Sequence, residues 1–141
     1  MKKTIGRIDK ADFPLFELYE IAVKIDTGAY TSSIHCKNVV EENGLLKCNF
    51  LDEEHPNYHG KEIIFKEYET AQVKSSNGIV QTRYKIKTKI LLFDEEFDIS
   101  LTLSDREEMK FPVLLGRTFL SKNFIVDTSL TNLSFKRKQK K

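Results

Sequence analysis

Asp26, Thr27 and Gly28 follow an alternating run of apolar and polar residues over positions 20–26. The alternation predicts a half-buried strand that ends at the aspartate. A carboxylate at a strand end can act as a general base on water, and the glycine permits a tight turn and close approach of a second backbone. The threonine hydroxyl can fix the loop through a hydrogen bond. The same tripeptide also favours an Asx-turn, so by itself it leaves a structural and a catalytic role open.

Two later segments accompany this aspartate along the chain. Residues 75–78 read Ser-Ser-Asn-Gly between two strand-like runs, and Asn-Gly is favoured in a type I′ turn, so we predict a β-hairpin over residues 71–90. Residues 113–116 form an apolar run that ends in glycine, and residues 117–122 are compatible with one short helix. The aspartate, the hairpin and the apolar segment therefore occur in this order within one small chain.

The length and composition of the chain limit the class of protein to which it can belong. The chain has 141 residues, which is the length of one domain with its own core. Apolar residues make up 40% and charged residues 31%, and no apolar run approaches the ~20 residues that span a bilayer, so we expect a soluble protein without a membrane partner. The N-terminus lacks the apolar segment of a secretory signal, which makes the cytoplasm the expected location.

Short alternating runs, β-branched residues, three prolines and six glycines favour an all-β fold. The polar segment 52–60 is predicted to be a loop. Besides the strand before Asp26 and the hairpin at 71–90, strands are predicted at positions 4–8, 45–51, 62–66, 85–92, 97–103, 125–127 and 133–135.

The last six residues form a basic tail. Residues 136–141 carry five positive charges, and since the formal net charge is +2, the remainder carries 2 − 5 = −3. A basic run can bind nucleic acid or anionic lipid, but no aromatic residue is interleaved here, so we expect a disordered solubilising end and no nucleic acid partner. The predicted organisation is one domain over residues 1–135 and a disordered tail over 136–141.

The order of these segments resembles that of the retropepsin-like aspartic peptidases. In those enzymes an Asp-Thr-Gly-Ala loop precedes a flap hairpin and then a segment of two apolar residues and a glycine. The stretches KIDTGAYTSSIHC, VKSSNGIVQTRY and PVLLGRTFLSKNFIVD are similar, more narrowly, to a bacterial family known as ATP-dependent zinc proteases. Genes of that family often accompany those of RimK-type ATP-grasp glutamate ligases. The resemblance covers most of the chain and rests on three motifs that agree in sequence and order.

The resemblance implies an acid-protease fold, a closed or partly open β-barrel with one short helix near residues 117–122. It implies an aspartic endopeptidase acting on peptides or proteins, a glutamate tail among them, with a functional link to a RimK-type ligase. Two carboxylates must share one proton and hold one water, so one Asp-Thr-Gly per chain implies a homodimer. The implied residues are Asp26 as catalyst, Thr27, Gly28 and Ala29 in its loop, Ser76, Asn77 and Gly78 in the flap, and Leu114, Leu115 and Gly116 beneath the loop.

Two features compete with or depart from that pattern. A second Asp-Thr pair begins at Asp127, but Ser129 follows it in place of glycine, so we reject a single-chain pair with Asp26. Retroviral enzymes commonly carry an acidic residue where this chain has Tyr30, and it pairs with the arginine after their second glycine. Arg117 therefore needs another partner.

The residues for zinc and ATP that the family's name implies are not recognisable in the sequence. No GxxxxGK[ST] run exists, so we expect no ATP site. His55 and His59 have i, i+4 spacing, but Pro56 stands where HExxH needs glutamate, and the loop composition argues against a helix. His35 and Cys36 point to opposite faces of a strand, which predicts a surface histidine and a core thiol. We therefore expect no cofactor and no metal.

The two cysteines, Cys36 and Cys48, belong to no CxxC motif and to no zinc-finger spacing. They are interpreted as reduced core thiols. A disulfide between them stays open at the level of sequence, although a cytoplasmic chain of this size does not need one.

Two other functions remain open on sequence grounds. An adaptor module beside a glutamate ligase would keep the peptidase fold without catalysis, and the Asp-Thr-Gly loop would be intact in both cases. Activity against an unbiased peptide pool separates the two. A metallopeptidase is the third function, which the zinc content of the purified protein tests. Lys74, Arg83 and Lys85 on the hairpin are compatible with an acidic substrate, but such cations also protect edge strands.

Overall fold

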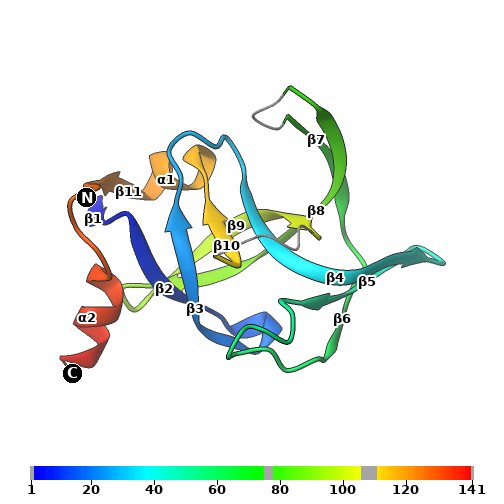
Figure 1. Ribbon diagram of the computed structural model, residues 1–141, viewed down its shortest axis with the longest axis horizontal. Coiled ribbons are helices and arrows are strands. Elements are labelled where there is room, and N and C mark those ends of the chain that lie inside the picture. Colours follow the sequence, from blue (N-terminus) through cyan, green and yellow to red (C-terminus); the bar gives the residue numbers. More distant parts are fainter. Residues whose placement is uncertain (1, 75–77, 106–110, 141) are drawn as a thin grey trace.

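The chain folds around a closed barrel of six strands. They are β2 (Ile8–Phe13), β3 (Leu18–Ile25), β4 (Ser32–Glu42), β8 (Val80–Leu92), β9 (Glu95–Ser104) and β10 (Val113–Leu115). The computed structural model describes residues 2–74, 78–105 and 111–140, and there the strands pair in the order β10, β3, β2, β8, β9, β4, with β4 returning to β10 (Figure 1). Because β10 runs parallel to β3 and β4 parallel to β9, the barrel is mixed. The predicted all-β barrel is confirmed in its closed form.

Alternation along the strands builds the core of the barrel. In β3, Ile21 and Val23 are buried while Lys24 is exposed, as the period of two predicts. At one end of the core the rings of Phe16 and Phe50 stack with their centroids 4.2 Å apart. Burial of one such side chain stabilises the fold by roughly 1.5–3 kcal/mol. The strand that precedes Asp26 is therefore anchored by its inward face.

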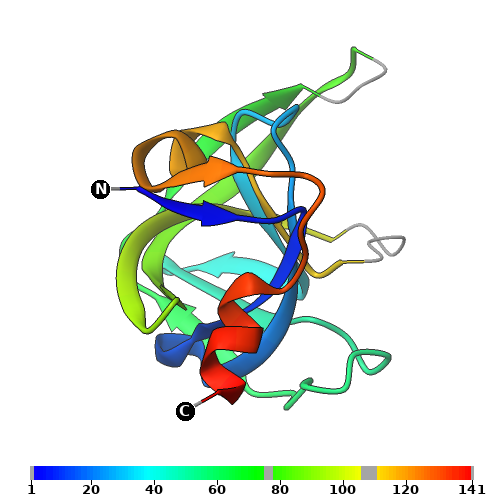
Figure 2. The same ribbon diagram turned by 90° about the vertical axis from the view of Figure 1, so that its left-hand side faces the viewer.

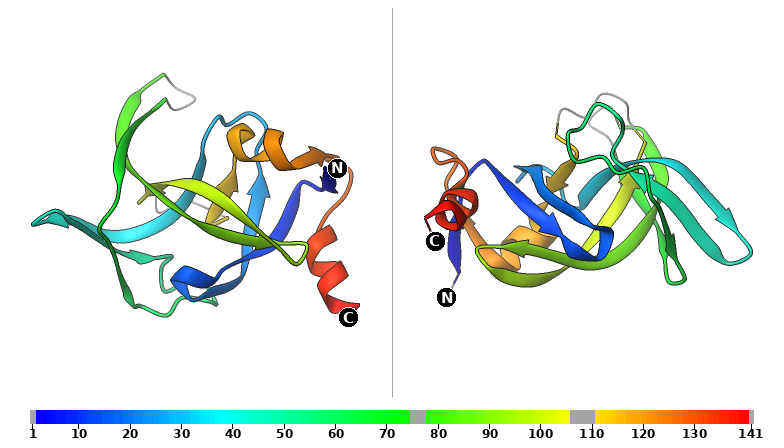
Figure 3. Two further views of the ribbon diagram at one scale, coloured as in Figure 1. Left: turned by 180° about the vertical axis from the view of Figure 1, so that it is seen from behind. Right: turned by 90° about the horizontal axis from the view of Figure 1, so that it is seen from below.

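Three strands extend the sheet beyond the barrel. β5 (Leu45–Phe50) pairs with β4, and β6 (Glu62–Phe65) pairs with β5, with the predicted loop 52–60 between them. β7 (Glu69–Lys74) pairs with the first half of β8 and forms the predicted hairpin, which projects from the barrel in Figures 1 and 3. The turn residues 75–77, which include Ser76 and Asn77, lie outside the described residues.

Segments from near both ends of the chain meet in a separate two-stranded sheet. β1 (Lys3–Ile5) runs parallel to β11 (Phe124–Val126), and Figure 2 shows them side by side. The short 3-10 helix η1 (Pro14–Phe16) joins β2 to β3, and α1 (Arg117–Asn123) confirms the helix predicted at 117–122. No helix in the described part of the chain is long and apolar enough to cross a membrane.

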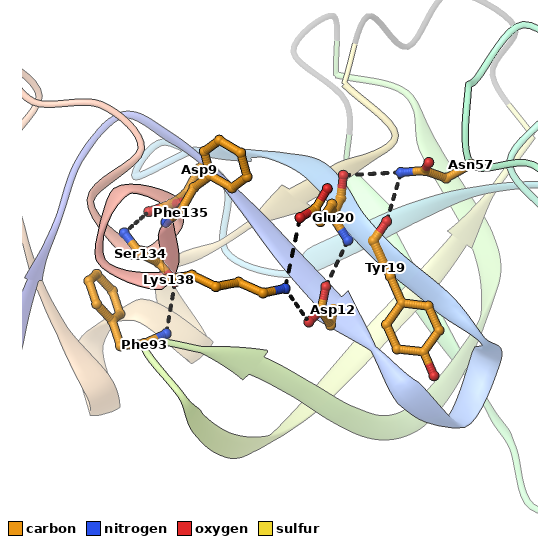
Figure 4. A network of polar contacts seen from close by, with 9 residues as sticks. All are labelled: Asp9, Asp12, Tyr19, Glu20, Asn57, Phe93, Ser134, Phe135 and Lys138. Atoms are coloured by element: carbon orange, nitrogen blue, oxygen red, sulfur yellow. Dashed lines mark hydrogen bonds and ion pairs between the residues drawn. The ribbon is translucent and has the colours of Figure 1, made fainter. Parts of the chain in front are cut away.

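A second helix, α2 (Leu133–Gln139), corrects two predictions for the end of the chain. The sequence predicts a strand at 133–135 and a disordered tail from 136, but one helix spans both segments. The reason is Asp9 on β2, whose buried carboxylate accepts hydrogen bonds from the N–H groups of Ser134 at 2.9 Å and Phe135 at 3.1 Å (Figure 4). A carboxylate at this end satisfies free amides and complements the helix dipole. The helix therefore starts on a cap that comes from the other end of the sequence.

The basic residues of α2 also contact the barrel. Lys138 Nζ lies 3.4 Å from Asp12 Oδ2 and 3.9 Å from Glu20 Oε1 (Figure 4). The N–H of Phe93, in the turn between β8 and β9, donates to Ser134 Oγ at 2.8 Å. Residues 136–139 thus belong to the folded domain rather than to a separate tail.

Candidate active site

Asp26 lies directly after β3 and is half-buried. Its backbone N–H donates to the carbonyl of Leu115 at 2.9 Å, which continues the parallel pairing of β3 with β10. Its Oδ1 accepts from the N–H of Gly28 at 3.1 Å, and its backbone oxygen accepts from the N–H of Ala29 at 3.2 Å. This Asx-turn occupies Oδ1, whereas Oδ2 has no protein partner within the described residues. A turn and a chemical role for Asp26 are therefore compatible.

Gly116 lies against the loop so closely that no side chain fits. A Cβ atom there would lie 2.5 Å from the backbone oxygen of Thr31 and 3.0 Å from that of Ala29. Leu115 before it is buried, and Leu114 is half-buried. Leu115 and Gly116 therefore contact the backbone of the segment 26–31 directly.

Arg117 contacts the backbone of the loop. In retroviral enzymes the corresponding arginine pairs with an acidic side chain instead. Arg117 Nη1 donates to the carbonyl oxygens of Thr27 at 3.0 Å and Gly28 at 3.2 Å. Its backbone N–H donates to the carbonyl of Ala29 at 2.8 Å. The guanidinium also lies over the ring of Tyr30, 5.7 Å from the centroid, a contact typical of cation–π pairs. Tyr30 thus contacts the same arginine through its ring.

The hairpin of β7 and β8 extends toward the same end of the barrel as the loop after β3 (Figures 1 and 2). Gly78, at the start of the second arm, has φ +85°, which glycine adopts readily. Ile79 and Val80 beside it are more than half exposed, at 57% and 56%. An exposed apolar pair at the end of a projecting hairpin is suited to cover a bound peptide.

A groove of about 600 Å³ opens between β8, β9 and α1. Tyr30 and Thr31 line it, so the groove reaches the loop that carries Asp26, although Asp26 itself is not among its lining residues. A peptide in this groove would extend away from the carboxylate rather than lie across it.

The groove carries excess positive charge. Its described lining includes one carboxylate, Asp98, which already pairs with Lys89. Three lysines line the groove and have no ion pair within the described residues. They are Lys85, Lys87 and Lys122.

Three polar side chains from distant segments meet near the loop 52–60. His35 on β4 is buried, with Nε2 3.0 Å from Asp52 Oδ2, and His55 Nε2 lies 3.9 Å from Asp52 Oδ1. The predicted surface position of His35 is therefore wrong. His59 contacts the carbonyl of Phe16 at 2.9 Å instead. Sequence reasoning missed Asp52 because the cluster depends on β4 passing beside the end of β5, which the spacing of these residues does not reveal.

Cys36 and Cys48 are buried free thiols, as the sequence predicts. A hydrogen bond with Cys48, together with burial, raises the pKa of Cys36 far above its ordinary value. These sulfurs belong to the core rather than to a reactive site.

Asp127, the start of the second Asp-Thr pair, follows β11 at the two-stranded sheet. Its Oδ1 accepts hydrogen bonds from Ser129 Oγ at 2.6 Å and from the N–H of Ser129 at 3.0 Å, and these lower its pKa. Asp127 therefore has a local turn role, which agrees with its rejection as a partner of Asp26.

A closed barrel whose Asp-Thr-Gly loop rests on an apolar strand and glycine has the architecture of a retropepsin-like aspartic peptidase. The chain belongs to the RimB-like family, described as retropepsin-like aspartic endopeptidase RimB, which it matches over residues 5–137.

Relatives and a solved structure agree with this assignment. The chain is 34% identical over 134 residues to a "Probable alpha-L-glutamate ligase" of Shewanella halifaxensis and 33% identical over 135 residues to a protein of the same name from Desulfotalea psychrophila. These alignments cover 91% and 92% of this chain, but the chain spans only 29% of either relative's length. The crystal structure of Lpg0085, a protein of unknown function from Legionella pneumophila, superposes with a TM-score of 0.68 at 27% identity, over 95% of this chain and 99% of that one.

Proposed function

We propose that the chain is an aspartic endopeptidase that acts as a homodimer, with one water held between the Asp26 carboxylates of two copies. The observation that carries the proposal is the uncommitted Oδ2 of Asp26 on a loop fixed by Leu115, Gly116 and Arg117. A fixed loop holds the carboxylate in one position without further cost at the moment of reaction. Membership of an aspartic endopeptidase family supports the same activity.

The chemistry follows from two carboxylates that share one proton. The ionised Asp26 takes a proton from water while the water oxygen attacks the carbonyl carbon of the scissile amide. The protonated Asp26 of the second copy gives its proton to the carbonyl oxygen, which yields a tetrahedral diol. The first Asp26 then gives the proton it took from water to the amide nitrogen as the C–N bond breaks. A hydroxyl of the diol returns a proton to the second Asp26, so the products are a carboxylic acid and an amine and the pair again shares one proton.

Gly28 supports the dimer. Its φ is outside the left-handed region, and a Cβ atom there would meet only Asp26 Oδ1, at an ordinary 3.4 Å. The fold of one chain therefore tolerates a larger residue at position 28. A second loop that approaches across a two-fold axis supplies a reason for glycine at this position.

The test is hydrolysis of a peptide library by wild-type protein and by Asp26→Asn. Removal of the general base is expected to lower the rate roughly 10²–10⁴-fold without loss of fold. Asp127→Asn is the matched control and should retain activity. When equal amounts of wild type and Asp26→Asn are mixed and allowed to exchange subunits, about a quarter of the dimers contain two wild-type chains. The mixture should therefore have about a quarter of the activity of wild type at the same total protein concentration, because both copies in a dimer must be intact. Activity of Asp26→Asn near the wild-type level, or of a strictly monomeric enzyme, contradicts the proposal.

We propose acidic peptides, with glutamate tails foremost, as the substrate class. The unpaired lysines of the groove support this because they present positive charge next to the loop. The name of the relatives, alpha-L-glutamate ligase, is compatible with a glutamate product as substrate.

Lys87→Glu combined with Lys122→Glu tests this substrate class. Exposed charge pairs contribute up to about 1 kcal/mol each, so the double reversal is expected to lower kcat/KM for a glutamate-rich peptide roughly tenfold. The matching glutamine-rich peptide should be unaffected. Lys37→Glu, an exposed lysine outside the groove, is the control. Equal effects on both peptides would contradict an acidic preference.

A further inference from the structure

We propose that His35, Asp52 and His55 form a binding site for a divalent transition metal of the zinc class, separate from Asp26. The candidate ligand atoms of the three side chains all lie within 4.8 Å of one another. Two imidazoles and one carboxylate form a donor set that borderline cations such as Zn²⁺ prefer.

The spacing of the cluster fits such an ion. Bonds of about 2.0–2.1 Å in tetrahedral geometry separate neighbouring ligand atoms by about 3.4 Å. Asp52 Oδ2 lies 3.0 Å from His35 Nε2, and the other oxygen of the same carboxylate, Oδ1, lies 3.9 Å from His55 Nε2, so the two distances fall on either side of that value. His55 is only partly buried and sits on a loop, so it can shift by the small amount required. The three ligands leave a fourth position open for water.

Two buried polar atoms without hydrogen-bond partners among the described residues also support a metal site. His35 is 1% exposed, and its Nδ1 has no hydrogen-bond partner within the described residues. Ser104 is 2% exposed and lies opposite His35 in the register of β4 and β9, and its hydroxyl also has no partner there. Coordination through Nε2 fixes the proton on Nδ1, and a metal-bound histidine usually donates that proton to a neighbouring oxygen. Ser104 provides an oxygen on the same face of the sheet.

The position of the cluster excludes a direct role in peptide hydrolysis by Asp26. The N–H of His35 donates to the carbonyl of Pro112, three residues before Leu115, which accepts the N–H of Asp26. At roughly 3.3 Å per residue along the strands, these three residues place His35 about 10 Å along β10 from the carbonyl that pairs with Asp26. The loop 52–60 also lies at the opposite end of the barrel from the loop after β3 (Figures 1 and 2).

The proposed ion would stabilise the fold. Asp52 and His55 belong to the loop 52–60, whereas His35 belongs to the barrel, so a shared ion would tie the loop to β4. The same loop contacts the start of β3 through Asn57, whose Nδ2 donates to the carbonyls of Tyr19 at 2.7 Å and Glu20 at 3.1 Å (Figure 4). Bound metal adds to the stability of the folded state by mass action.

The experiment measures zinc binding to the untagged, chelator-treated full chain by calorimetry and metal analysis. We expect close to one Zn²⁺ per chain, a higher Tm with Zn²⁺, and slower hydrogen exchange in residues 52–60. His55→Ala removes a ligand from a loop and should weaken zinc binding at least roughly 100-fold. His59→Gln, in the same loop but outside the cluster, is the matched control and should bind zinc like the wild type.

Cobalt gives an independent readout of the ligands. Co²⁺ in place of Zn²⁺ should show the visible bands of a four-coordinate site with nitrogen and oxygen donors, and His55→Ala should lose them. A thiolate charge-transfer band would place the metal on Cys36 and Cys48 and overturn the proposal. Zinc binding that His55→Ala does not weaken, or no binding by the wild type, would overturn it as well. None of these outcomes depends on peptidase activity.

Discussion

Arg117 Nη1 donates a hydrogen bond to the backbone oxygen of Thr27 at 3.0 Å. An exposed side chain from the start of α1 thereby fixes the loop of Asp26 from the solvent side, while Gly116 fixes it from below. The same side chain also donates to the carbonyl of Gly28 and lies over the Tyr30 ring. The orientation of the loop therefore depends on a planar cation that can stack and donate at once.

Arg117→Leu is expected to reduce kcat/KM roughly 100-fold, because a small displacement of a catalytic group is sufficient for that loss. The free energy of unfolding should change by less than about 1 kcal/mol, since the side chain is exposed. Arg117→Lys keeps the charge but loses the fork and the stacking, so it should recover only a small part of the activity. Peptidase kinetics and thermal unfolding of the same preparations test this, and full activity of Arg117→Lys would show that charge alone is sufficient.

The glycines of the two motifs are expected to respond differently to alanine. At Gly116 the new methyl group would lie 2.5 Å from the Thr31 carbonyl oxygen, so Gly116→Ala should destabilise the fold by roughly 1–3 kcal/mol. At Gly28 only an ordinary contact arises, so the free energy of unfolding of Gly28→Ala should lie within about 1 kcal/mol of the wild-type value. Denaturant unfolding measures both.

Gly28→Ala should nevertheless lose peptidase activity, because its methyl group points to the space that the proposed second loop fills. Sedimentation of the variant at several concentrations reports whether the dimer has weakened. A Gly28→Ala protein with wild-type activity and association would argue against close approach of two loops.

Asp9 is expected to control whether α2 is folded. Its carboxylate accepts two N–H groups at the start of the helix, so Asp9→Ala should cost about 1–3 kcal/mol by leaving buried amides without partners. Hydrogen exchange in residues 133–139 should accelerate most. Asp12→Ala removes one partner of Lys138 and the acceptor of the Glu20 N–H, but no contact with the backbone of α2, so it should have a smaller effect on exchange in the helix. Equal exchange in α2 for both variants would show that Asp9 does not act as the cap.

The parts of the fold and site that follow from sequence are those with a local cause. The strand before Asp26 is set by its own alternation, the hairpin at 71–90 by Asn-Gly, and the helix after Gly116 by the run that follows it. Helix α2 could not be predicted, because its cap, Asp9, is separated from Ser134 by 125 positions.

The sequence also failed to predict the burial of His35, and the reason is related. Strand alternation places neighbouring residues on opposite faces, but in a closed barrel with additional strands both faces of β4 are covered, and residues 32–36 are all buried. The same crowding brings Asp52 to His35. Contacts between distant segments thus determine the parts of the site that local pattern leaves undefined.

The two thiols are expected to be unreactive in the folded protein. A hydrogen bond with Cys48 and burial raise the pKa of Cys36, so this thiol stays protonated at neutral and mildly alkaline pH, while Cys48 is protected by its burial. Because the thiolate is the reactive form, iodoacetamide should label neither cysteine in the native protein at neutral or mildly alkaline pH, whereas both should react in denaturant. Mass spectrometry of timed samples measures this, and Cys48→Ala should remain equally protected at Cys36 by burial. Rapid native labelling that follows thiolate formation near the ordinary cysteine pKa would contradict the predicted environment.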